Sequence, residues 1–118
     1  MTQSSTEPAT LRQRARQFLV HSFLYYRLGE SVVSDAFYDR ITEELRGLRK
    51  KHPKAEMPHA DLIDAHLGAE ASGFAIKAYP PEIVTSAFKL LYAVSSPPVE
   101  FTEFVERRGY LAEIAHGP

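Results

Sequence analysis

The chain has 118 residues, of which 44% are hydrophobic and 25% charged, and its 14 Lys and Arg are balanced by 15 Asp and Glu. One globular domain with its own core has this size and composition. The absence of cysteine excludes disulfides, thiolate zinc sites and cysteine nucleophiles, and a formal net charge of −1 gives no general attraction for nucleic acid. No apolar run is long enough to span a membrane and residues 1–10 lack a signal-peptide pattern, so we expect a cytoplasmic domain.

The first predicted element is a long helix. Residues 1–9 are small and polar, and we expect a flexible arm there. From Thr10, the expected N-cap, apolar side chains recur every three or four residues to about Arg27. Gly29 follows, and glycine suits the left-handed residue after a helix end.

A second helix is predicted between Ser34 and Pro53. Ser34 is a favourable N-cap residue, and Asp35 then lies at the positive end of the helix dipole. An apolar stripe follows at helical spacing, formed by Phe37, Ile41, Leu45 and Leu48. Residues 10–53 are therefore expected to form an antiparallel αα-hairpin.

Residues 54–118 are expected to add further helices to the same domain. Residues 73–79 alternate weakly between apolar and polar side chains, which is compatible with a short extended segment. Pro81 suits the first position of a strong helix, and a shorter helix is predicted at about 100–108. The sequence thus predicts an all-α single domain of about four helices over residues 10–118.

The candidate site lies at the turn of the predicted hairpin. Because positions i, i+3 and i+4 of a helix share a face, Asp35, Tyr38 and Asp39 are expected to project together, away from the apolar stripe. The hairpin brings them toward Tyr25 and Tyr26. Tyrosine rings attract cations and carboxylates accept hydrogen bonds, so this group would suit a flat, positively charged ligand that donates hydrogen bonds. The alternative is that the tyrosines pack between helices and the first aspartate only complements the helix dipole.

This motif resembles the N-terminal domain, called Ia, of bacterial NAD-dependent DNA ligases. Members of that family carry an aromatic pair, a short turn, the motif Ser/Pro-Asp-Ala-x-Tyr-Asp, and a helix that ends in His-Pro. The corresponding residues here are Tyr25-Tyr26, Ser34-Asp35-Ala36-Phe37-Tyr38-Asp39 and His52-Pro53. The resemblance covers about residues 11–53.

The resemblance implies a module that closes over nicotinamide mononucleotide, the pyridine half of NAD. Carried across by position, Tyr25 and Tyr38 would flank the pyridinium ring. Asp35 and Asp39 would accept hydrogen bonds from the ribose or the carboxamide. Tyr26 stands where many ligases have histidine, and a phenol is a weaker phosphate partner than an imidazolium.

The sequence predicts binding of nicotinamide mononucleotide, NAD or a related nucleotide without catalysis. The ligase motif Lys-x-Asp-Gly is absent, since Lys77 is followed by Ala78-Tyr79-Pro80, and zinc-finger cysteines are lacking. We therefore expect no catalytic residue and no DNA ligase activity. An enzyme that acts on NAD is the least favoured hypothesis, because Asp35 and Asp39 are its only candidate bases.

The second half is similar to the tail of short, stand-alone ligase-related proteins of phages and prophages, through Ser72-Gly73-Phe74 and Tyr79-Pro80-Pro81-Glu82-Ile83-Val84. That similarity implies a mobile-element protein. It supports a second hypothesis, in which the chain binds a host protein, as a ligase mimic or against a defence or replication factor, without nucleotide. The apolar residues Phe101 and Phe104 leave a homodimer open as an alternative to core packing.

Other polar groups favour simpler interpretations. The cluster of His59, Asp61, Asp64 and His66 lies on several faces of a helix, so we predict a solvated segment and no metal site. The basic run from Arg46 to Lys51 complements a helix C-terminus, so no direct contact with nucleic acid is predicted.

Overall fold

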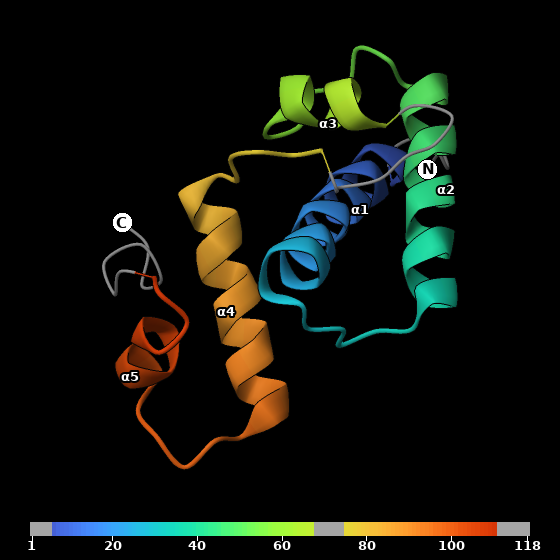
Figure 1. Cartoon of the computed structure of the whole chain (residues 1–118). Coiled ribbons are helices and arrows are strands. Elements are labelled where there is room, and N and C mark those ends of the chain that lie inside the picture. The colour runs from blue at the N-terminus through green and yellow to red at the C-terminus, as the bar shows by residue number, and fades with distance from the viewer. Residues whose placement is uncertain (1–5, 68–74, 111–118) are drawn as a thin grey trace.

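The computed structural model describes residues 6–67 and 75–110, and the helices in them lie around one central helix. The elements are α1 (Glu7–Ser22), the π-helical turn η2 (Phe23–Arg27), α2 (Asp35–Lys51), α3 (Ala60–His66), α4 (Pro81–Ser95) and α5 (Phe101–Glu106). Helix α1 lies between α2 and α4, and α5 packs on the far side of α4 (Figure 1). The described residues contain no strand, and the predicted all-α fold is confirmed.

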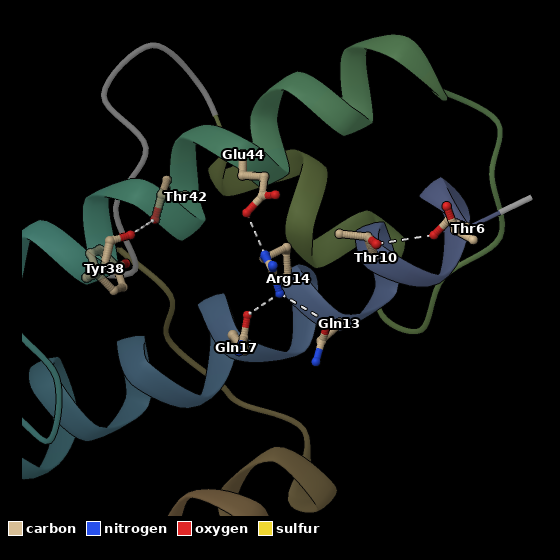
Figure 2. A network of polar contacts seen from close by, with 8 residues as sticks. All are labelled: Thr6, Thr10, Gln13, Arg14, Gln17, Tyr38, Thr42 and Glu44. Carbon is tan, nitrogen blue, oxygen red and sulfur yellow. Dashed lines mark hydrogen bonds and ion pairs between the residues drawn. The ribbon is translucent and has the colours of Figure 1, made fainter. Parts of the chain in front are cut away.

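Helix α1 begins earlier than the sequence predicted. It starts at Glu7 rather than after Thr10, so the last residues of the expected arm 1–9 are helical. Pro8 explains the difference, because proline in a first turn has no N–H that would need an acceptor. Thr10 does not cap the helix, since its hydroxyl donates to the carbonyl oxygen of Thr6 at 3.2 Å (Figure 2).

The ends of the hairpin helices at the turn follow the prediction. Gly29 has a φ of 67°, and the Glu30 N–H donates to the Leu24 carbonyl oxygen at 2.9 Å, which closes the C-terminal end of the first helix. The Ser34 hydroxyl accepts the Phe37 N–H at 3.1 Å and caps α2 as predicted. The turn between the two helices is therefore fixed at both sides.

Polar contacts tie α1 to α2 along the pair. The Arg14 Nε donates to Glu44 at 2.6 Å, and its Nη1 donates to Gln17 at 3.1 Å (Figure 2). At the end away from the turn, the carboxylate of Glu7 lies 2.8 Å from the ring nitrogen of His52. This hydrogen bond lowers the pKa of the Glu7 carboxyl. These pairs are partly exposed to solvent, so each contributes little to the free energy of unfolding.

The segment predicted to be solvated is not free of contacts, because two of its polar residues, His59 and Asp64, bind side chains of other elements. Arg49 of α2 donates to both carboxylate oxygens of Asp64 at 2.9 Å, and this contact holds the pKa of that carboxyl below its usual value. His59 lies 2.9 Å from Glu82 of α4. Within residues 6–67 and 75–110, no group of three His, Asp or Glu side chains could hold a metal ion.

Helix α4 covers the side of α1 that α2 leaves open. It buries an apolar face formed by Ile83, Val84, Ala87, Phe88 and Leu91. The ring of Phe23, in η2, meets the edges or faces of Tyr79, Phe88 and Tyr110 at centroid distances of 5.2, 5.9 and 5.6 Å. This aromatic packing holds the end of the first helix against the second half of the chain.

The remaining predictions fall partly within the described residues. Of the segment 73–79, only 75–79 is described, and it is neither helical nor paired as a strand, with Ile76 fully buried. The short helix predicted at 100–108 is confirmed as α5, which is followed by Gly109 at a φ of 80°. None of the described helices is both long and apolar enough to cross a membrane.

Replacing Leu45 tests whether the contact between α1 and α2 is central to stability. This side chain is fully buried, and Leu45→Ala should lower the free energy of unfolding by about 2–5 kcal/mol because it leaves a cavity. Urea denaturation followed by circular dichroism measures the change. Lys50→Ala, on the exposed side of α2, is the control and should stay within about 0.5 kcal/mol of the parent. A loss below about 1 kcal/mol for the leucine variant would contradict the described packing.

Candidate ligand-binding pocket

A hollow of about 260 Å³ opens at the turn between the first two helices. It is here called the junction pocket. The five residues predicted from the sequence all line it, namely Tyr25, Tyr26, Asp35, Tyr38 and Asp39. Six further residues complete its wall: His21, Glu30, Ser31, Val32, Val33 and Ser34. The hairpin thus brings together every side chain that the motif singled out.

The π turn η2 supplies the tyrosine wall of the pocket. A π turn is closed by hydrogen bonds between residues five apart, one more than in an α-helix. Both Tyr25 and Tyr26, four and five residues after His21, therefore reach the same hollow as that histidine. The two tyrosine rings meet edge to face, with centroids 4.8 Å apart. Periodicity had indicated an uninterrupted α-helix here, and the π turn was not predicted.

Tyr38 forms the part of the wall that is most firmly held. Its hydroxyl lies 2.7 Å from the Ser22 hydroxyl of α1, and its ring stacks on Phe18 at 6.1 Å. The sequence left open whether the tyrosines pack between helices or face a ligand. Tyr38 packs against α1 and also lines the pocket, whereas Tyr25 is half exposed.

The carboxylates give the pocket its charge. Asp35 is the first residue of α2, where the helix dipole favours a negative group, and Asp39 lies one turn further on. Glu30 comes from the turn, with a carboxylate oxygen 3.5 Å from the guanidinium of Arg108. The residues that line the pocket include three carboxylates and no lysine or arginine. Such a surface favours a cation that also donates hydrogen bonds.

His21 is a pocket residue that the sequence analysis missed. It is 8% exposed, and burial lowers the pKa of its imidazole. Its ring meets the ring of Phe37 at an angle of 85°. The sequence contains a signal for its position: His21 and Tyr25 are four residues apart, and such positions share a helix face.

The part of the chain that forms the junction pocket is similar to a known protein family. Residues 1–60 match the family model described as the DNA ligase-like, N-terminal NAD+-binding domain. The chain belongs to this family. Every side chain that lines the junction pocket lies between residues 21 and 39, inside the match.

Sequence relatives point to the same family. The chain is 45% identical over 63 residues to a DNA ligase of Roseiflexus castenholzii, a match covering 53% of this chain and 8% of the ligase. It is 38% identical over 55 residues to a DNA ligase of Frankia casuarinae, covering 47% of this chain and 8% of that ligase. The chain therefore spans less than a tenth of the length of these ligases. No solved structure gives a significant match.

The family assignment confirms the resemblance seen at the hairpin. It supports an NAD-related, ligase-like module, and it covers α1, η2 and α2. Helices α3, α4 and α5 start at or beyond its end. The likeness of this second half to phage proteins stays a prediction from sequence.

The burial of His21 predicts a pH effect on stability. Because its pKa in the folded chain is below 6.5, the unfolded chain takes up the proton first as the pH falls. The free energy of unfolding should therefore decrease from about pH 6.5 down to the folded pKa. His21→Gln should reduce this decrease in urea denaturation at pH 5 and 7.

A nuclear magnetic resonance titration of the histidine rings provides the direct measurement. The His21 resonance, assigned by its loss in His21→Gln, should have a midpoint below 6.5. A midpoint at or above 6.5 would contradict the buried position of this ring.

Proposed function

We propose that the junction pocket binds the nicotinamide end of nicotinamide mononucleotide or NAD, and that this chain does so without catalysing a reaction. The observation that carries the proposal is the convergence of the five ligase-motif residues on one acidic, tyrosine-lined hollow. The NAD+-binding family to which the chain belongs supports the choice of ligand.

The chemistry of the pocket fits a pyridinium ring. Such a ring is flat and positively charged, so it is attracted both by tyrosine faces and by carboxylates. Tyr25 and Tyr38 would flank the ring. Asp35 and Asp39 would accept hydrogen bonds from the carboxamide and the ribose hydroxyls. In this proposal Tyr26 completes the wall beside Tyr25.

The size of the pocket fits only part of the ligand. Complete small-molecule sites enclose roughly 300–1,000 Å³, and the junction pocket measures about 260 Å³. It suits one ring and its sugar rather than a whole dinucleotide. One stacked ring and two or three hydrogen bonds support a dissociation constant in roughly the high-micromolar to millimolar range.

Two hydroxyl groups of the pocket wall are held by neighbouring groups of the protein, which suits a preformed binding surface. The Ser31 hydroxyl donates to the Val33 carbonyl oxygen at 2.8 Å. The Tyr38 hydroxyl is engaged with Ser22.

The alternative hypothesis is a module that binds a host protein without nucleotide. No contact or surface among the described residues favours it over nucleotide binding, so it stays a prediction from the sequence, together with the homodimer.

An amide nuclear magnetic resonance titration of the full labelled chain tests the proposal. Nicotinamide mononucleotide should shift the resonances of Tyr25, Asp35, Tyr38 and Asp39 at millimolar concentration. Its reduced form, with a neutral ring, should bind more weakly, because the attraction between the ring and the carboxylates is lost. Nicotinic acid mononucleotide should also bind more weakly, since it replaces the carboxamide by a carboxylate. Absence of any shift at millimolar nucleotide would overturn the proposal.

Charge-removing variants test the role of the aspartates. Asp35→Asn and Asp39→Asn should each weaken binding of nicotinamide mononucleotide by about tenfold, because a neutral amide accepts hydrogen bonds less strongly. Isothermal titration calorimetry measures the change. The control is Asp61→Asn, an exposed residue of α3 outside the pocket. Unchanged affinity in both pocket variants would show that these carboxylates do not contact the ligand.

A further inference from the structure

A second hollow lies next to the junction pocket and has a different character. It measures about 400 Å³ and is bounded by α1, α4 and the turn before α2. Three side chains, those of His21, Val32 and Val33, line both hollows. The two are therefore neighbours across these side chains. The second hollow is here called the α4 groove.

The α4 groove presents an apolar surface to solvent. Ser86, Leu90 and Val94 follow one another at four-residue spacing, so they form one face of α4. Val20 of α1 and Phe37 of α2 lie opposite. The side chain of Val94 is 58% exposed, so this end of the groove is open to solvent.

One arginine lines the α4 groove and a second lies beside one of its lining residues. Arg16 lines it and donates a hydrogen bond to the Ser86 hydroxyl. The guanidinium of Arg40 lies 5.4 Å from the centre of the Phe37 ring. In the described part of the chain, neither arginine forms an ion pair with a carboxylate. Guanidinium groups bind phosphates through paired hydrogen bonds.

The two neighbouring hollows therefore differ in charge. The junction pocket is lined by carboxylates, which would repel a phosphate. The α4 groove is lined by Arg16 and apolar side chains, with Arg40 over the ring of Phe37. The parts of a pyridine dinucleotide follow one another in an order that matches the two hollows: a cationic ring, then phosphates, then a flat purine. Its second half needs cations for the phosphates and an apolar surface for the base.

We propose that the α4 groove is a second subsite, which holds the phosphates and the purine of a dinucleotide whose nicotinamide lies in the junction pocket. The inference rests on the proposed function. The phosphates pass over Val32 and Val33 toward Arg16 and Arg40, and the purine lies against the apolar face of α4. The chain thus holds a whole dinucleotide through an element outside the family match.

Three nucleotides distinguish the two subsites in a titration of the full chain with labelled backbone amides and methyl groups. Nicotinamide mononucleotide should shift the amides of Tyr25 and Tyr38 at the junction pocket. Adenosine monophosphate should shift the methyl groups of Leu90 and Val94. NAD should shift both sets and bind at least about tenfold more tightly than nicotinamide mononucleotide, because the two halves are linked.

A charge placed on the groove tests the second subsite separately. Val94→Asp should abolish the tenfold advantage of NAD and leave the affinity for nicotinamide mononucleotide unchanged, since a carboxylate there places a charge on the apolar surface that holds the purine. Ala93→Asp is the matched control, because Ala93 and Val94 are both exposed. It adds the same charge one residue earlier on the same helix and outside the groove, and it should keep most of the advantage.

The results separate this inference from the proposed function. Equal affinities for NAD and nicotinamide mononucleotide, with unmoved Leu90 and Val94 methyl groups, would overturn the second subsite and leave the junction pocket standing. Shifts from adenosine monophosphate without any from nicotinamide mononucleotide would overturn the proposed function and the dinucleotide with it.

Discussion

The burial of the C-terminal part of α1 on all sides is the constraint on which the rest of the structure depends. The five consecutive residues from Phe18 to Ser22 are all buried, and five consecutive helical positions point in every direction around the axis. One neighbouring helix can cover only one side. Helix α2 covers the side of Phe18 and Ser22 through Tyr38, and α4 packs on another (Figure 1). The hairpin matched by the ligase-like family therefore requires the second half of the chain to complete its core.

Local signals determined what the sequence could predict. Ser34 and Gly29 act through their own side chain or backbone and a few neighbours, so the turn and both adjacent helix ends were predicted correctly. The motif spacing brought the site residues to one pocket for the same reason. The start of α1 was placed too late because the proline in its first turn was assigned to the arm.

What the sequence could not predict depends on distant residues. The π turn places Phe23 against Phe88 and Tyr110, which are more than sixty residues away, and no local pattern reports such packing. Asp64 was interpreted as part of a solvated segment because its partner Arg49 lies on another helix. The α4 groove is likewise formed by elements that only the fold brings together.

The two walls of the junction pocket differ in how firmly they are built. Asp35 and Asp39 stand on the first turns of an α-helix, whose N-terminus is capped by the Ser34 hydroxyl. Tyr25 and Tyr26 stand on a π turn, which has one residue more than the α-helical turn and is rarely stable on its own. The wall on α2, which also carries the firmly held Tyr38, is therefore more regularly built than the wall formed by Tyr25 and Tyr26. A ligand entering here would meet carboxylates and a Tyr38 ring in fixed positions, so charge would set its orientation and the half-exposed Tyr25 would adjust to its shape.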